Sequence, residues 1–265
     1  MKKITVDLYE YFGEKKSSDG GILNGSIREN DRPVMLIIPG GAYSFLCYRE
    51  NKPFEKKFYD LGYNAFYLDY SVGDNVRYGI ALKEVLMAIT YIRKNFSSKL
   101  GIIGFSAGGH LVGESCSGEK DLSFLGENKE YFITPDAVVY CYPVVSTKTD
   151  LIHEWSFQSL LKDKFESLKD KVSVENLINN ESSPAFIFHC ADDSVVPVGN
   201  SIELANAYLK NGVKVELHVF PRGGHGVALP TLECFTEEEL KNVNINKELT
   251  VWFDLCLNFL KNNGI

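Results

Sequence analysis

Residues 99–115, KLGIIGFSAGGHLVGES, place a serine between an apolar run and a helical pattern. The run Lys99–Gly104 is typical of a buried strand, and the residues from His110 onward continue as a helix. Between them lies a GxSxG pentapeptide centred on Ser106. A strand-to-helix turn of this kind holds the serine in a strained backbone conformation and tolerates only small flanking residues. The sequence therefore predicts that the Ser106 hydroxyl stands above a sheet at a helix N-terminus, where backbone N–H groups favour negative charge.

The same alternation of strand and helix extends in both directions from this turn. Val34–Ile38 is a continuous apolar run, which predicts a strand buried on both faces. Val215–Phe220 alternates apolar and polar residues, which predicts a more exposed strand near the edge of the sheet. This order predicts an α/β fold, with a mostly parallel central sheet and helices on both faces. The remaining strands are expected at 64–69, 137–141 and 185–189, and the other helices at 53–61, 75–96, 201–210 and 247–261.

One stretch, at about 146–180, departs from this alternation. It is charged, contains neither glycine nor proline, and has only weak helical periodicity. Two interpretations stay open, a small cap or insert over the active site and a long solvated excursion. Because the chain shows no tandem repeat and no linker rich in Pro, Gly or Ser, we expect a single domain over residues 1–265.

A glycine-containing loop, PGGAY at residues 39–43, follows the earlier buried strand. If Ser106 is a nucleophile, this loop would supply one N–H group to an oxyanion hole, and Ala107 would supply the other. Glycines suit this position because a side chain would block the approach of the backbone. Each donor aimed at a tetrahedral oxyanion contributes on the order of 10²–10³ in rate. Gly41 and Ala42 are both candidates for the loop donor, and the sequence does not distinguish them.

Two adjacent aspartates follow the strand predicted at 185–189, in the run HCADDSVVP. A carboxylate just beyond a strand end, upstream of the last histidines, lies where an orienting acid belongs in the chain order Ser, Asp, His. Such an acid would accept the histidine N–H, fix its tautomer and stabilise the imidazolium. We favour Asp193 for this role, and Asp192 remains the alternative.

The candidate base is one of the two histidines that lie downstream of these aspartates. His218 falls within a predicted strand, whereas His225 lies in the loop RGGHG directly after that strand. Glycines beside His225 would let its imidazole reach both the serine and the aspartate, so the predicted triad pairs His225 with Ser106. The other histidines are assigned structural roles: His110, His153 and His189.

With these residues in order, the chain resembles α/β-hydrolases of the acetyl-esterase and carbohydrate-esterase type, which include xylanase-associated esterases and sugar hydrolases. The resemblance runs from about Pro33 to His225 and rests on PGGAY, YREN, GFSAGGH, PDAVVYCYPV, HCADDSVVPV and FPRGGHG. In that family the acid lies four residues before the proline of a DxxVP run, which corresponds to Asp193 and Pro197. The oxyanion loop departs from lipase-like HGGG loops, because Pro39 stands where those loops begin with histidine.

The resemblance implies hydrolysis of small acyl esters, especially acetyl groups on sugars such as acetylated oligosaccharides. The residues by themselves indicate ester or amide hydrolysis through an acyl-enzyme on Ser106, with no metal and no organic cofactor. A serine peptidase of the prolyl-oligopeptidase type is the alternative function, although such enzymes usually carry an additional large domain. A non-catalytic binding protein that retains the fold is a third hypothesis, which the presence of all three triad residues disfavours.

The composition disfavours some classes of binding partner and predicts a cellular compartment. The formal net charge of -7 and the sequence pI of about 5.4 disfavour a nucleic-acid partner, since phosphate binding needs a basic field. The N-terminus, MKKITVDLYEYFGEKK, lacks the apolar run of a secretory signal, and no later segment approaches the ~18 apolar residues of a membrane span. The 6 cysteines are widely spaced, which is typical of reduced thiols. We therefore expect a cytoplasmic protein that binds neither nucleic acid nor membranes.

Overall fold

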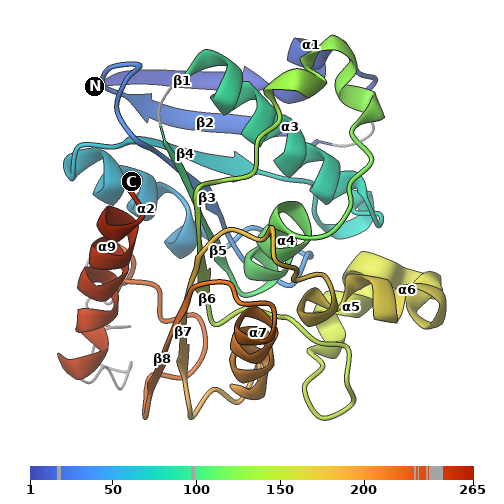
Figure 1. Ribbon diagram of the computed structural model, residues 1–265, viewed down its shortest axis with the longest axis vertical. Coiled ribbons are helices and arrows are strands. Elements are labelled where there is room, and N and C mark those ends of the chain that lie inside the picture. The colour runs from blue at the N-terminus through green and yellow to red at the C-terminus, as the bar shows by residue number, and fades with distance from the viewer. Residues whose placement is uncertain (17–18, 97–98, 230, 232, 237, 239–246) are drawn as a thin grey trace.

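One eight-stranded sheet runs through the part of the chain that the computed structural model describes, which is residues 1–16, 19–96, 99–229, 231, 233–236, 238 and 247–265 (Figure 1). The strand order is β1-β2-β4-β3-β5-β6-β7-β8. Neighbouring strands from β4 to β8 are parallel, whereas β2 is antiparallel to both β1 and β4. The strands are β1 (Lys2–Asp7), β2 (Ile22–Ile27), β3 (Val34–Ile38), β4 (Asn64–Asp69), β5 (Leu100–Phe105), β6 (Ala137–Cys141), β7 (Ala185–Cys190) and β8 (Val215–Phe220).

Helices cover both faces of this sheet, as predicted. The helices α3, α4 and α7 pack on one face, and α2 and α9 pack on the other (Figure 1). Short 3-10 segments lie between them: η1 (Tyr48–Glu50), η2 (Gly73–Asn75), η3 (Ser123–Tyr131), η4 (Lys162–Lys164), η5 (Val174–Asn176) and η6 (Lys247–Val251). The α-helices are α1 (Leu8–Phe12), α2 (Lys52–Asp60), α3 (Ile80–Asn95), α4 (Ala107–Cys116), α5 (Glu154–Leu161), α6 (Phe165–Val172), α7 (Gly199–Lys210) and α9 (Trp252–Asn262).

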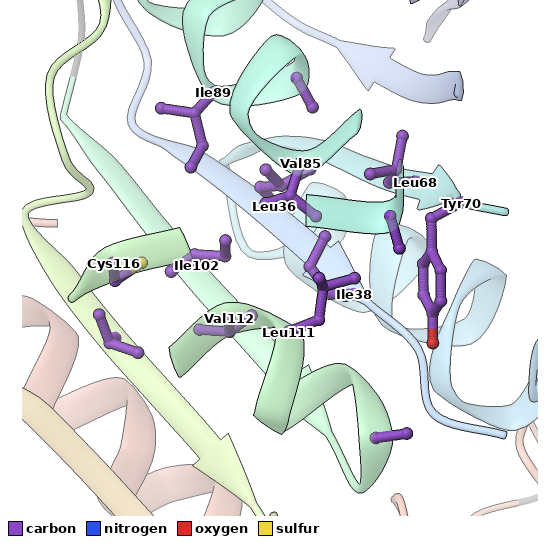
Figure 2. Close-up of a cluster of buried hydrophobic side chains, with 14 of the residues drawn as sticks. Leu36, Ile38, Leu68, Tyr70, Val85, Ile89, Ile102, Leu111, Val112 and Cys116 are labelled. Carbon is purple, nitrogen blue, oxygen red and sulfur yellow. The ribbon is translucent and has the colours of Figure 1, made fainter. Parts of the chain in front are cut away.

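The core between α3, α4 and the sheet explains the continuous apolar strands. Figure 2 shows Val85 of α3 and Leu111 of α4 among the buried side chains that face Leu36 and Ile102 of the sheet. A second core under α2 and α9 buries the opposite side of the same strands. Because both faces are covered, a central strand such as β3 has no exposed residue and reads as an unbroken apolar run. Strand β8, at the edge, is only partly buried, as its alternating sequence predicts.

Strands β1 and β2, at the opposite edge, are absent from the prediction. Every residue of β1 is at least partly exposed, because β1 has a neighbour on one side only. Strand β2 carries Asn24 and Ser26 within its run. Neither strand therefore shows the unbroken apolar run that marks the central strands, and their formation depends on the register with β4, in which Leu23 pairs with Leu68.

Two further segments differ from the expectation or refine it. The helix expected at 75–96 begins only at Ile80, because Gly79 adopts a left-handed φ of 91° at its N-cap. Residues 146–180 contain the short elements α5, η4, α6 and η5, which extend beside α4 and α7 in Figure 1. Buried side chains of this segment, such as Phe157 and Val172, join the same core as α3 and α4.

Two expectations from composition concern cysteines and membranes. All six cysteines are free, and five of them are buried. In the described part of the chain, no helix is both long and apolar enough to cross a membrane.

Candidate active site

Ser106 lies in the turn between β5 and α4, where the GxSxG pattern places it. Its backbone has φ 51° and ψ −118°, a conformation that residues other than glycine rarely adopt. A Cβ on Gly104 would lie 2.5 Å from the carbonyl oxygen of Gly108, and a Cβ on Gly108 would lie 2.3 Å from that of Ile38. Larger residues at either glycine would therefore push α4 away from the sheet, which is the physical reason for the motif.

Three side chains from distant parts of the sequence form one hydrogen-bonded chain. The Oγ of Ser106 lies 2.9 Å from Nε2 of His225, and Nδ1 of His225 lies 2.7 Å from Oδ2 of Asp193. Asp192, the alternative acid, instead accepts the Gly224 N–H at 2.8 Å through its Oδ1. Of the two aspartates, Asp193 is thus the one in contact with the histidine. This is the arrangement of a nucleophile, a base and an acid that orients the base.

The Asp193 carboxylate is held by hydrogen bonds to both of its oxygens. Its Oδ1 accepts the N–H groups of Val195 and Val196, both at 2.9 Å. Its Oδ2 contacts His225 and also Nε2 of His189, at 3.1 Å. Burial alone would raise the pKa of Asp193, but the hydrogen bonds from His189 and His225 outweigh burial and hold it well below its usual range. These contacts favour the ionised form of Asp193.

His189, assigned a structural role from the sequence, stands directly behind this acid. Its Nδ1 lies 2.7 Å from the hydroxyl of Ser201 on α7. If that hydroxyl donates to Nδ1, the proton of the ring resides on Nε2, which then donates to Asp193 and to the carbonyl oxygen of Val196, 3.0 Å away. The position of Asp193 is therefore set by the packing of α7 as well as by its own loop.

The PGGAY loop lies beside Ser106, at the end of β3. Among the residues that the structure describes, no acceptor takes the amide N–H of Gly41, Ala42 or Ala107. The neighbouring Gly40 N–H, in contrast, donates to Oε2 of Glu50 at 2.8 Å. The three predicted donors are thus available for an oxyanion, and Gly41 and Ala42 border the same pocket as Ser106.

Two buried tyrosine hydroxyl groups hold this loop in place through hydrogen bonds. The hydroxyl of Tyr70 donates to the carbonyl oxygen of Pro39 at 2.8 Å. The hydroxyl of Tyr43 lies 2.7 Å from Nδ1 of His110, whose Nε2 lies 2.7 Å from the carbonyl oxygen of Val172. His110 thus has the structural role expected for it, and it links the oxyanion loop to the 146–180 segment.

A pocket of about 250 Å³ opens above Ser106. One wall is the oxyanion loop with Phe45, and another comes from the 146–180 segment, which contributes His153 and Trp155. The sequence predicts a structural role for His153 and gives Trp155 no role, because aromatic side chains serve packing more often than they line a pocket. Burial lowers the pKa of His153, and the nearby His225 lowers it further.

Curated relatives match most of this chain. It is 34% identical over 218 residues to Endo-1,4-beta-xylanase B of Butyrivibrio fibrisolvens, and 28% identical over 225 residues to an acetylxylan esterase of Xylanibacter ruminicola. These alignments cover 77% and 79% of this chain but 34% and 44% of the relatives. The chain therefore spans less than half the length of these relatives.

A solved structure and a family model define the fold and the family. The acetyl ester-xyloside bifunctional hydrolase of Caldicellulosiruptor lactoaceticus matches with a TM-score of 0.75 at 31% identity, covering 92% of this chain and 88% of that one. The predicted α/β-hydrolase fold is thereby confirmed. A model of the BD-FAE family matches residues 22–208, a range that includes Ser106 and Asp193. The chain therefore belongs to the BD-FAE family of α/β-hydrolases.

Proposed function

We propose that this protein is a serine esterase that removes short acyl groups, acetyl above all, from carbohydrate esters. The observation that carries the proposal is the hydrogen-bonded chain from Ser106 through His225 to Asp193. Amide donors that have no acceptor among the described residues lie beside the candidate nucleophile, which suits acyl transfer through a tetrahedral oxyanion. Relatives named for acetylxylan and for acetyl ester-xyloside hydrolysis support the choice of acyl group and alcohol.

In the proposed reaction, Oγ of Ser106 attacks the ester carbonyl while Nε2 of His225 accepts the hydroxyl proton. The amides of Ala107 and of the PGGAY loop hold the oxyanion, and Asp193 stabilises the imidazolium. The C–O bond to the sugar then breaks, and the imidazolium gives its proton to the departing sugar oxygen. Water, deprotonated by the same imidazole, attacks the acyl-enzyme; the bond between the acyl carbon and Oγ then breaks, the imidazolium returns the proton to Oγ, and the carboxylic acid is released. The cycle is balanced in protons and electrons with these side chains alone.

The mouth of the pocket supports a sugar as the alcohol. The side chains of Phe45 and Trp155 are 50% and 54% exposed, and their rings lie 6.2 Å apart at an angle of 46°. Large exposed aromatic surfaces next to a catalytic pocket favour a ligand with flat apolar faces, such as the C–H face of a pyranose ring. The polar groups of Arg49 and His153 line the same pocket and can bind sugar hydroxyls.

The test compares wild type and Ser106→Ala on p-nitrophenyl acetate, butyrate and octanoate and on acetylated xylo-oligosaccharides. We expect activity on the acetate and the sugar acetates, with kcat at least about 10⁴-fold lower in the variant. Ser167→Ala, at an exposed serine of α6, is the control and should behave as wild type.

Other results would redirect the proposal. Activity that rises with acyl length would indicate a general esterase. Wild-type turnover no better than that of Ser106→Ala on every ester would overturn the esterase proposal, and peptide substrates, the alternative from the sequence, would then be tested.

A further inference from the structure

Glu50 is a buried carboxylate that the reaction steps above do not use. It lies between the oxyanion loop (residues 39–43) and the histidine loop (residues 221–228). Glu50, the last residue of η1, is 2% exposed. Burial raises its pKa, while hydrogen bonds from Gly40 and Tyr142 and the nearby His225 act in the opposite direction. A buried carboxylate is costly unless its partners are well placed, so its contacts indicate what it does.

Both oxygens of Glu50 accept hydrogen bonds from active-site loops. Oε2 accepts the Gly40 N–H at 2.8 Å, and Oε1 accepts the Tyr142 hydroxyl at 2.8 Å. The same hydroxyl accepts the Ala228 N–H at 3.1 Å. A chain of three hydrogen bonds thus joins the residue before Gly41 to a residue in the loop that carries the candidate base.

This chain also contacts the nucleophile and the base by packing. A Cβ on Gly40 would lie 2.8 Å from Oε2 of Glu50 and 2.9 Å from Cβ of Ser106. A side chain at position 40 would therefore clash with both the carboxylate and the nucleophile. On the other side, the Tyr142 ring meets the His225 ring at a centroid distance of 5.1 Å and an angle of 68°.

Strained backbone gathers around the groups that Glu50 joins. Of the six non-glycine residues with positive φ in the described part of the chain, two lie in the oxyanion loop, one in the histidine loop, one in the nucleophile turn and one, Tyr142, directly after β6. A strained conformation persists only where surrounding contacts impose it. The strained residues of the site are Ala42 (52°), Tyr43 (58°), Ser106 (51°), Tyr142 (39°) and Ala228 (44°).

We propose that Glu50 is a positioning residue that ties the oxyanion loop to the histidine loop, so that the amide donors stay aimed at the tetrahedral oxyanion. It acts through Gly40 and Tyr142 and takes no part in proton transfer. The inference rests on the proposed acyl-enzyme mechanism and deepens it, because it names the group that keeps the oxyanion hole in place.

The hydrogen-bond pattern explains why a carboxylate is needed. The Gly40 N–H can only donate, and the Tyr142 hydroxyl accepts from Ala228 and donates its single proton to Glu50. A carboxylate offers two acceptors, whereas glutamine offers one acceptor and one NH₂ donor. Glu50→Gln therefore keeps the size of the side chain but leaves one of the two donors without an acceptor, in either orientation of the amide.

The experiment measures four variants: Glu50→Gln, Tyr142→Phe, the double variant and Glu55→Gln. Glu55 of α2 is the matched control, a glutamate 3% exposed that pairs with Lys3 at 2.8 Å. Three quantities are read: kcat and KM for p-nitrophenyl acetate, the inhibition constant of a trifluoromethyl ketone, and the rate at which a fluorophosphonate labels Ser106. The ketone reports tetrahedral-oxyanion binding, and labelling reports the nucleophile without any particular ester.

We expect Glu50→Gln to lower kcat and the labelling rate roughly 10–100-fold while KM stays within about twofold. The ketone should bind more weakly by the same factor as kcat/KM falls. Tyr142→Phe should show the same pattern, and the double variant should be no slower than the slower single variant, because both changes break one link. A merely structural loss would lower the active fraction without this selective effect on oxyanion binding.

Two outcomes would overturn the inference separately or together with the proposed function. If wild type and Glu50→Gln label at the same rate, or if the losses of the two single variants multiply, Glu50 does not hold the oxyanion loop. If wild type neither labels nor hydrolyses any ester, the proposed acyl-enzyme mechanism fails first, and the inference fails with it.

Discussion

The catalytic loops and the 146–180 segment border the same pocket, but they are built differently. The catalytic loops, which follow β3, β5, β7 and β8 together with Tyr142 after β6, are joined across elements by hydrogen bonds such as that of Gly40 with Glu50, and they hold five residues at positive φ. The 146–180 segment packs through one face of short helices, with Phe157 buried, and presents an exposed Trp155 to the pocket. The first region is held by hydrogen bonds between its loops, whereas the second packs through the buried side chains of short helices and is linked to the rest of the chain by hydrogen bonds such as that of Ser159 with Ser44.

The difference reflects what each region must supply. A nucleophile, a base and oxyanion donors act only within narrow limits of distance and angle, so their loops need many mutual contacts. A pocket wall needs only a surface of suitable shape, so a segment whose side chains are positioned less precisely is sufficient. We therefore expect changes in the catalytic loops to affect kcat and changes in the 146–180 segment to affect KM for the sugar ester.

Within the catalytic loops, the largest expected effect on kcat distinguishes the two adjacent aspartates. Asp193→Asn should lower kcat by about 10³–10⁴-fold, because the amide cannot hold the histidine in the correct tautomer or stabilise the imidazolium. Asp192→Asn should lower kcat less than about fivefold, because Asp192 contacts only the loop amide of Gly224 among the hydrogen bonds described. Steady-state kinetics on p-nitrophenyl acetate measures both variants. Equal losses would contradict the assignment of Asp193 as the acid.

A second test concerns the buried cluster where the two regions meet. Burial lowers the pKa of His110 to about 4 and raises that of Glu114, 3.5 Å away, to about 8, so neither group is charged at neutral pH. Because folded Glu114 binds its proton more tightly than the unfolded chain does, its stabilising effect is complete below pH 4.5 and is lost as pH rises through about 8. The free energy of unfolding of the wild type should fall by about 1.4 kcal/mol per pH unit across this range relative to Glu114→Gln.

Chemical unfolding at several pH values measures this difference. Glu166→Gln, at a glutamate side chain that is 79% exposed, is the control and should follow the wild-type pH dependence. Parallel curves for wild type and Glu114→Gln would show that Glu114 is not buried in its neutral form.

The smallest expected effect is a change in KM when the pocket wall formed by the 146–180 segment is altered. Trp155→Ala should raise KM for acetylated xylo-oligosaccharides by roughly 3–10-fold and leave kcat/KM for p-nitrophenyl acetate within about twofold, since the small ester does not reach the rim. Tyr131→Ala, an exposed tyrosine of η3, is the control. A loss of equal size on both substrates would instead place Trp155 among the residues that shape the acyl site.

Most of the fold and the triad could be predicted from local patterns. The central strands could be predicted because burial on both faces makes them apolar throughout, as in β3. Strand β1 could not be predicted in this way because all its residues are at least partly exposed, and β2 could not because Asn24, Gly25 and Ser26 interrupt its apolar run. The start of α3 was placed too early because a helical pattern does not reveal that Gly79 adopts a left-handed conformation.

The sequence by itself determined the nucleophile turn, the chain order of the candidate triad and the fold class, because each depends on neighbouring residues or on the order of elements. Only the tertiary structure decided that Asp193 rather than Asp192 contacts His225, and that His153 and Trp155 enter the pocket. It also decided that Glu50 joins two loops. The physical reason is that these contacts join residues far apart in the chain, and local periodicity carries no information about which distant groups meet.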